Sequence, residues 1–118
     1  MELTDKNYQT IIKNHNKPVF IDFYSPTCSP CQILTKLIDE KLEEYGEKND
    51  VRVVKCNIRE NPKLAEAFKI RSVPFTIAVL PDEKLKHADI GLKHETYYFE
   101  LIDKLAGKNT SFFSRFFT

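Results

Sequence analysis

Two cysteines separated by two residues, Cys28 and Cys31, are the side chains best suited to chemistry in this 118-residue chain. A thiolate is a strong nucleophile, and two thiols at this spacing can close into a disulfide and reopen. A Cys-x-x-Cys pair near alternating strands and helices is typical of redox proteins. The chain has three cysteines, and an odd number does not suit a framework of structural disulfides.

The pair lies where a predicted strand gives way to a predicted helix. Ser25-Pro26-Thr27 interrupts an apolar run, and helical spacing begins at Cys28. Pro30 suits the first helical turn, where its missing N–H costs nothing. A thiolate at Cys28 then meets free N–H groups and the positive end of the helix dipole, which lower a thiol pKa. We predict that Cys28 attacks a substrate disulfide and that Cys31, one turn further on, resolves the mixed disulfide.

Two other interpretations of the pair compete with redox chemistry. A structural zinc site commonly needs four ligands, whereas Cys56 falls on a separate predicted strand and the three histidines are scattered. No metal or other cofactor is predicted. The pair could also be two small buried residues, but the position of Pro30 would then be a coincidence. Cys56 is most simply a buried hydrophobic residue, with a regulatory thiol as the alternative.

The elements that position the pair alternate between strands and helices, which indicates an α/β domain with helices on both faces of its sheet. Asp22 is the one charged residue in an otherwise apolar strand, so that strand is expected to be buried on both faces. A turn at Pro81 favours an antiparallel hairpin at one edge. The predicted strands are 18–24, 51–56, 75–80 and 85–90, and the predicted helices are 5–14, 28–46, 61–68 and 95–106. Asp5 is expected to cap the first helix, and Gly46 to end the second.

Length and composition favour one domain, residues 1–107, followed by a Phe-rich tail, residues 108–118. A net charge of +1 with mixed signs lacks the basic stripe of nucleic-acid binding, so no nucleic-acid partner is predicted. No apolar run approaches the roughly 20 residues of a membrane span, and the first residues do not resemble a signal peptide. The expected location is therefore cytoplasmic.

The tail carries four phenylalanines whose spacing places them on one helical face. We predict that they pack back on the domain or on a second copy of the chain. A partner, a membrane surface and disorder are the alternatives. These residues are Phe112, Phe113, Phe116 and Phe117.

Several separated motifs, in the right order, resemble the thioredoxin family over residues 2 to about 107. The resemblance implies the thioredoxin fold, a central mixed sheet of four to five strands, and the exchange of thiols with protein disulfides. It also implies recharging by a flavin-dependent thioredoxin reductase or a similar electron donor. The motifs are Asp22-Phe23-Tyr24, Cys28-Ser29-Pro30-Cys31, Lys55-Cys56-Asn57-Ile58, Asn61-Pro62, Ile70-Arg71-Ser72-Val73-Pro74 and Gly91.

The resemblance also implies roles for individual residues. Asp22 matches a buried carboxylate beneath the cysteines, and Lys55 matches the lysine beside it. Independently of the family, burial in an apolar strand should raise the pKa of Asp22, so that it can accept the proton of Cys31 near neutral pH. A structurally hydrogen-bonded Asp22 and an ordinary exposed Lys55 are the alternatives.

Pro74 matches the family's cis-proline, which faces the cysteine pair. The Val73 backbone would then pair with an extended substrate segment, and Gly91 would complete the rim of that groove. The other expected substrate contacts are Thr27, Ser29, Pro30 and Phe75.

Five positions depart from the family pattern, which leaves the reaction intact and points to a distinct set of partners. They are Tyr24 and Thr27 for two tryptophans, Ser29 for a glycine, Lys36 for a helix proline and Phe75 for a threonine. Because no cation lies between the cysteines, we expect a dithiol reductant. The alternatives are an oxidant or isomerase, if the protein is exported, and a binding or adaptor module with little turnover.

Overall fold

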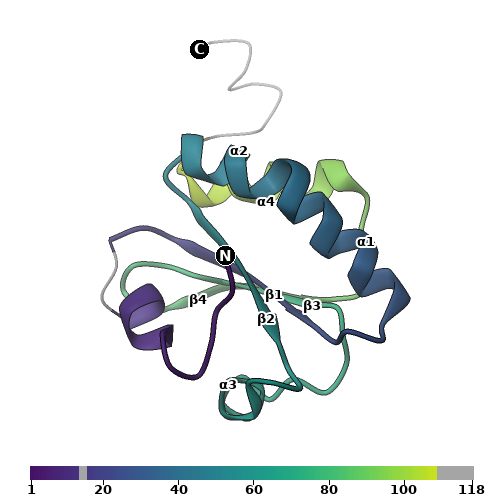
Figure 1. Cartoon of the computed structure of the whole chain (residues 1–118). Coiled ribbons are helices and arrows are strands. Elements are labelled where there is room, and N and C mark those ends of the chain that lie inside the picture. Colours follow the sequence, from purple (N-terminus) through teal and green to yellow (C-terminus); the bar gives the residue numbers. More distant parts are fainter. Residues whose placement is uncertain (14–15, 109–118) are drawn as a thin grey trace.

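A mixed sheet of four strands, in the order β2-β1-β3-β4, forms the centre of the molecule (Figure 1). The computed structural model describes residues 1–13 and 16–108, so the predicted contacts of the four tail phenylalanines lie outside the described residues. β1 is parallel to β2 and antiparallel to β3, and β4 is antiparallel to β3. This confirms the predicted mixed sheet. The strands are β1 (Val19–Tyr24), β2 (Arg52–Asn57), β3 (Phe75–Val79) and β4 (Leu85–Ile90).

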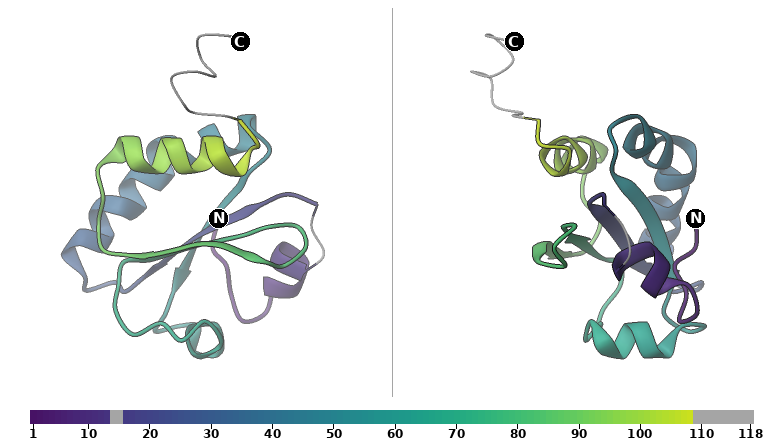
Figure 2. Two further views of the ribbon diagram at one scale, coloured as in Figure 1. Left: turned by 180° about the vertical axis from the view of Figure 1, so that it is seen from behind. Right: turned by 90° about the vertical axis from the view of Figure 1, so that its left-hand side faces the viewer.

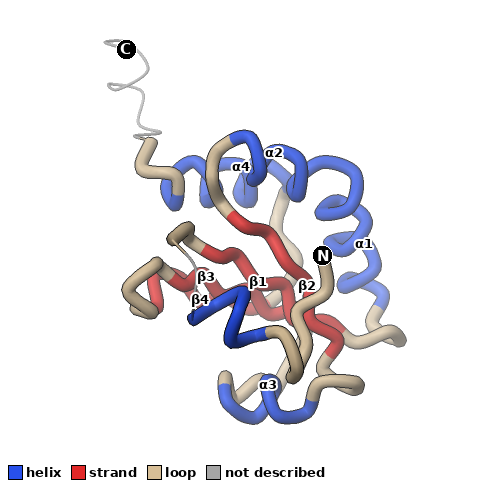
Figure 3. Tube along the Cα trace, turned by 60° about the vertical axis from the view of Figure 1, so that its left-hand side comes forward, coloured by secondary structure: helices blue, strands red, loops and turns tan. Residues whose placement is uncertain are grey.

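Helices cover both faces of the sheet, as predicted (Figures 2 and 3). On one face lie α4 and a long helix made of three consecutive segments, which is continuous because the residues at the junctions keep right-handed helical dihedrals. On the other face lie a short π-helical segment and α3. Within the described ranges, no helix is long and apolar enough to cross a membrane. The long helix comprises α1 (Ser29–Leu37), the π-helical η2 (Ile38–Leu42) and α2 (Glu43–Lys48); the others are η1 (Gln9–Lys13), α3 (Pro62–Ala67) and α4 (Glu95–Leu105).

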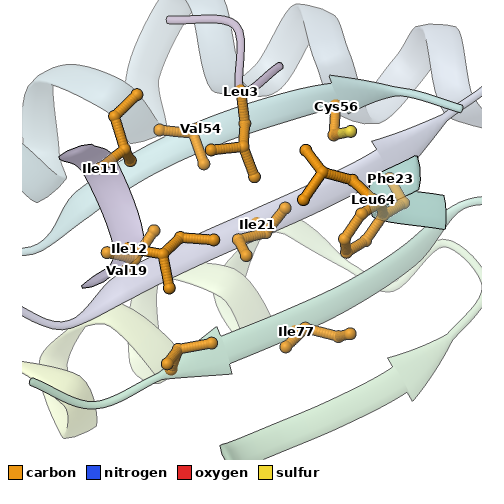
Figure 4. Packing of buried hydrophobic residues seen from close by; sticks show 11 residues of the cluster. Leu3, Ile11, Ile12, Val19, Ile21, Phe23, Val54, Cys56, Leu64 and Ile77 are labelled. Atoms are coloured by element: carbon orange, nitrogen blue, oxygen red, sulfur yellow. The ribbon is translucent and has the colours of Figure 1, made fainter. Parts of the chain in front are cut away.

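Strand β1 is buried on both faces because its side chains alternate between two cores. Ile21 and Phe23 join the core beneath η1 and α3, which Figure 4 shows from close by. Phe20 joins the core beneath α1 and α4, where it packs with Leu34 and Tyr98. Asp22 has the same parity as Phe20, so it lies on the face that α1 covers, and it is fully buried.

The prediction that the long helix ends at Gly46 is wrong, because the helix continues to Lys48. A Cβ atom at Gly46 would lie 2.6 Å from the Val51 carbonyl oxygen and 2.6 Å from Cγ2 of Val53. A glycine is therefore required by the close approach of the helix to the start of β2. The Gly46 carbonyl also accepts the Val51 N–H at 2.9 Å, which closes the turn into that strand.

Asp5 does not cap the first helical segment, in contrast to the prediction. The Thr4 hydroxyl accepts the Asn7 N–H at 3.1 Å there. The Asp5 carboxylate instead accepts the N–H groups of Lys63 at 3.2 Å and Leu64 at 2.9 Å, at the start of α3. Because the first N–H groups of a helix have no partner within it, this contact satisfies two of them and joins the N-terminal segment to α3.

Candidate active site

Four segments that belong to different strands meet at one edge of the sheet. Tyr24 at the end of β1 pairs with the last residue of β2, and Phe23 pairs with Phe75 at the start of β3. Phe75 in turn pairs with Ile90 at the end of β4. The segments along this edge therefore follow the order of the strands: the loop after β2, the loop after β1, the segment before β3, and the segment after β4.

The loop after β1 carries the cysteine pair, and the two cysteines form a disulfide. Cys28 is the N-cap residue of α1, and its Sγ accepts the Cys31 N–H at 3.2 Å. Cys28 is half-buried, whereas Cys31 is only 1% exposed. The Sγ of Cys28 lies 3.7 Å from the carbonyl oxygen of Val73. Cys28 is therefore the more exposed cysteine of the pair, and it lies at a helix N-terminus, which favours a thiolate.

The segment before β3 runs alongside the pair and contains a cis peptide bond between Val73 and Pro74. The Pro74 carbonyl accepts the Gly91 N–H at 2.8 Å, which brings the segment after β4 to the same place. Gly91 has a φ of +88°, a left-handed conformation that favours glycine. Within the described residues, neither the N–H nor the C=O of Val73 is bonded to another main-chain group. This short backbone stretch is therefore available to a further strand.

Asp22 lies in the protein interior on the face that α1 covers. Burial raises the pKa of its carboxyl to about 8, and the nearby Lys55 ammonium offsets part of that rise. Neither carboxylate oxygen has a hydrogen-bond partner among the described residues. A carboxyl in this state holds its proton at neutral pH and exchanges it with groups of similar pKa.

Lys55 pairs with Asp22 in the register of β1 and β2, but its ammonium contacts two other carboxylates. Nζ lies 2.6 Å from an Asp39 oxygen and 3.5 Å from a Glu2 oxygen. Burial lowers the pKa of Lys55, but these two carboxylates outweigh that effect and the pKa is raised. Neither Glu2 nor Asp39 is among the site residues predicted from the sequence. Asp39 falls two turns after Cys31 on a predicted helix, but nothing in the pattern indicated its distance from Lys55.

Three residues beside the cysteines, Thr27, Ser29 and Pro30, are exposed around the pair. The Thr27 hydroxyl accepts a hydrogen bond at 3.0 Å from Nη2 of Arg59, which lies in the loop after β2. Arg59 is not among the site residues predicted from the sequence either, because no local pattern marks its proximity to Thr27. Val73 lies against the Cys28 sulfur from the other side, and Pro74 and Gly91 are joined to the Val73 segment.

Phe75 lies elsewhere, on the sheet face opposite α1. It packs against the core beneath η1 and α3, and it lines a cavity of about 640 Å³ there together with Tyr8 and Leu64. Neither cysteine of the pair lines this cavity. A contact between Phe75 and a substrate stays a prediction. The position of Phe75 on this face could have been predicted from the alternation of side chains along β3, because Phe75 and the core residue Ile77 are two residues apart and point to the same face.

Cys56 is a buried core residue on the face opposite to Lys55, as predicted (Figure 4). Burial, with a smaller contribution from nearby carboxylates, raises the pKa of its thiol to about 12. A thiol in this state is protonated at neutral pH and is a poor nucleophile. The redox chemistry therefore rests on Cys28 and Cys31.

Comparisons with known proteins agree with this geometry. A family model described as thioredoxin matches residues 1–104. A thioredoxin of Rickettsia felis is 35% identical over 102 residues, which cover 86% of this chain and 94% of that protein. Thioredoxin 1 of Synechococcus elongatus is 31% identical over 102 residues, with 86% and 92% covered. A thioredoxin of Pyropia yezoensis is 38% identical over 73 residues, with 62% and 66% covered. The chain therefore belongs to the thioredoxin family and is a thiol–disulfide oxidoreductase, a thioredoxin-like disulfide reductase whose redox pair is Cys28 and Cys31.

Proposed function

We propose that Cys28 is the attacking thiolate and Cys31 the resolving thiol in the reduction of protein disulfides. The observation that carries this assignment is the difference in exposure between the two cysteines, together with the N–H that Cys31 donates to the Cys28 sulfur. The Cys28 thiolate attacks one sulfur of the substrate disulfide, breaks that bond and releases the other sulfur as a thiolate. Cys31 then attacks Cys28 and releases the second substrate thiol. Two electrons pass to the substrate, and the protein is left with the Cys28–Cys31 disulfide.

We propose that Asp22 accepts the proton that Cys31 must lose before it attacks. An ordinary thiol has a pKa near 8.5. The pKa of Asp22, about 8, is close to this value, so transfer of the thiol proton to the ionised carboxylate costs little free energy. At pH 7 about one molecule in ten carries that ionised form, and the resolution step should therefore speed up as the pH rises towards 8. Lys55 is a positioning residue in this proposal, since its ammonium moderates the pKa of Asp22. An Asp22→Asn variant should resolve the mixed disulfide about 10²-fold more slowly, the low end of general-base effects.

The substrate is expected to lie in extended form against Val73, because the N–H and C=O of that residue are not bonded to another main-chain group of the described residues and can pair with a further strand. Pro74 and Gly91 would form the floor and rim of the site, and Thr27, Ser29 and Pro30 its opposite wall. A disulfide held there would lie next to the sulfur of Cys28. These contacts are supported by position only.

The direction of electron flow indicates in which compartment the protein works and which electron donor it needs. Ser29 and Pro30 place no cation between the cysteines, so nothing there stabilises the reduced form strongly. We propose a cytoplasmic dithiol reductant that is recharged by a flavin-dependent thioredoxin reductase or a similar donor, because the cytosol keeps such thiols reduced. Self-association through the four tail phenylalanines stays a prediction. Sedimentation of the full chain beside a chain that ends at residue 108 tests it.

The reduction potential of the Cys28–Cys31 pair tests whether the protein donates electrons to its substrates or accepts electrons from them. The protein is equilibrated with glutathione or dithiothreitol, and the free thiols are trapped; a Cys56→Ala variant confirms that the titration reports on the pair alone. A potential near about −270 mV, like that of thioredoxin, supports the cytoplasmic reductant. A potential of about −180 mV or higher, like that of disulfide isomerases, contradicts it and favours an exported oxidant or isomerase. A Ser29→Gly variant shows whether the serine raises the potential.

A further inference from the structure

Arg59 occupies the loop after β2, next to the loop that carries Cys28. The two loops are neighbours because β1 and β2 are parallel and end together, with Tyr24 opposite Asn57. The order of the strands places the Val73 segment on the other side of Cys28, before β3. Arg59 and Val73 therefore flank the redox pair from two sides of one sheet edge.

The Arg59 loop is held in place by hydrogen bonds. The buried Asn57 side chain accepts the N–H of Arg59 at 3.0 Å, and the Asn57 carbonyl accepts the Asn61 N–H at 3.0 Å. The Ile58 N–H donates to the Tyr24 carbonyl at 3.0 Å and joins the loop to the end of β1. The guanidinium is therefore carried by an ordered turn, although its side chain is exposed.

The guanidinium of Arg59 has unused binding capacity. It donates one hydrogen bond, from Nη2 to the Thr27 hydroxyl, the residue directly before Cys28. Among the described residues, no carboxylate forms an ion pair with it, although Glu60 is its neighbour in sequence. By contrast, Lys55 and Lys93 both pair with carboxylates of the protein. An arginine has five N–H donors in a planar fork that fits a carboxylate, so most of its donors remain for a ligand.

We propose that Arg59 is a specificity-determining residue that binds an acidic side chain of the substrate, on the side of the substrate disulfide that faces away from Val73. The proposal rests on the proposed function, since it assumes that Cys28 attacks the disulfide of a docked protein segment. The preferred substrate segment is then extended where it passes Val73 and carries Asp or Glu where it passes Arg59.

The test measures how fast the fully reduced protein reduces a series of peptides in single turnover. Each peptide has one disulfide, and the peptides differ only in carrying Glu, Gln or Lys beside the attacked cysteine. We expect the Glu peptide to react about two- to five-fold faster than the Gln peptide, which is the range of exposed ion pairs. The preference should fall as salt is raised towards 1 M, where the screening length shrinks to about 3 Å.

Four variants separate the proposal from its competitors. Arg59→Gln should make the Glu and Gln peptides react at equal rates, and Arg59→Glu should reverse the preference in favour of Lys. Arg52→Gln, which removes the same charge at the opposite end of β2, should keep the preference of the wild type. Arg71→Gln, on the Val73 side of the pair, should keep it as well.

Other results would overturn the proposal. An Arg59→Gln variant that slows all three peptides equally would show that Arg59 acts on the Cys28 thiolate. A preference that survives Arg59→Gln but disappears in Arg71→Gln would place the acidic contact on the other side. If the Gln peptide is reduced normally but no variant changes the ratios, the inference fails and the proposed function stands. If no peptide is reduced, the proposed function fails and this inference with it.

Discussion

Replacing Asp22 by Asn should abolish a pH dependence of stability that the buried carboxyl creates. In the oxidised protein, burial raises the pKa of Asp22 to about 8, whereas an Asp in an unfolded chain has a pKa of about 3.9. Between these two values, the unfolded protein releases the Asp22 proton and the folded protein keeps it. Unfolding therefore becomes easier as the pH rises, and the penalty is absent below about pH 4.

The size of the effect follows from the two pKa values. One pKa unit corresponds to about 1.36 kcal/mol, so Asp22 lowers the free energy of unfolding by about 4 kcal/mol at pH 7 relative to pH 4. By pH 9 the loss levels off at about 5 kcal/mol relative to pH 4, since the folded carboxyl is then charged as well. This is a large share of the 5–15 kcal/mol that stabilises a typical domain.

The assay is urea unfolding of the oxidised wild type and Asp22→Asn, followed by circular dichroism at several pH values from 4 to 9. Other titrating groups, including the half-buried His87, are common to both proteins and cancel in the difference. Asp82→Asn makes the same exchange at an exposed carboxyl and serves as the control. A difference between wild type and Asp22→Asn that does not change from pH 5 to pH 8 would refute the reasoning. A difference that grows in favour of the wild type would show that Asp22 is buried as an anion.

Three further predictions concern the cysteine pair, the lysine and the helix. A Cys31→Ser variant should accumulate a covalent mixed disulfide between Cys28 and the substrate, detected by mass spectrometry, whereas Cys28→Ser should form none. Lys55→Gln should raise the pKa of Asp22 above that of the wild type, because the offsetting charge is removed; a carbon-13 titration of the carboxyl measures it, and a lowered pKa would contradict the assignment. Gly46→Ala should lower the free energy of unfolding by about 1–3 kcal/mol, a typical cost of overpacking, because its Cβ would meet a backbone carbonyl at 2.6 Å. An unchanged urea midpoint would mean that the helix shifts freely away from β2.

The order and type of the elements could be predicted because local patterns determine them. The apolar run of β1, the change to helical spacing at Cys28 and the turn at Pro81 are all contained in short stretches of sequence. The burial of Asp22 was predictable for the same reason, since a charged residue inside a strand apolar on both faces has no route to solvent. The position of Cys56 followed from the alternation of side chains along β2.

Features that depend on contacts between distant segments could not be predicted in the same way. Asp5 stands before a helical pattern and therefore suggested a local cap, but its carboxylate reaches the start of α3. Gly46 suggested a helix end, but it is required by the approach of another segment. The acidic partners of Lys55 come from the N-terminus and from the long helix, and only the packed structure brings them together.

The described chain ends at Lys108, which donates a hydrogen bond to Asn49 just beyond the long helix. That helix begins at the cysteines and runs about 30 Å to α2. Residue 108 therefore lies at the pole opposite the sheet edge where electrons are exchanged. The domain can be tethered to a surface, an electrode or another protein through this end while its redox edge stays open to solution, so fusion proteins and immobilised sensors should be built from this end.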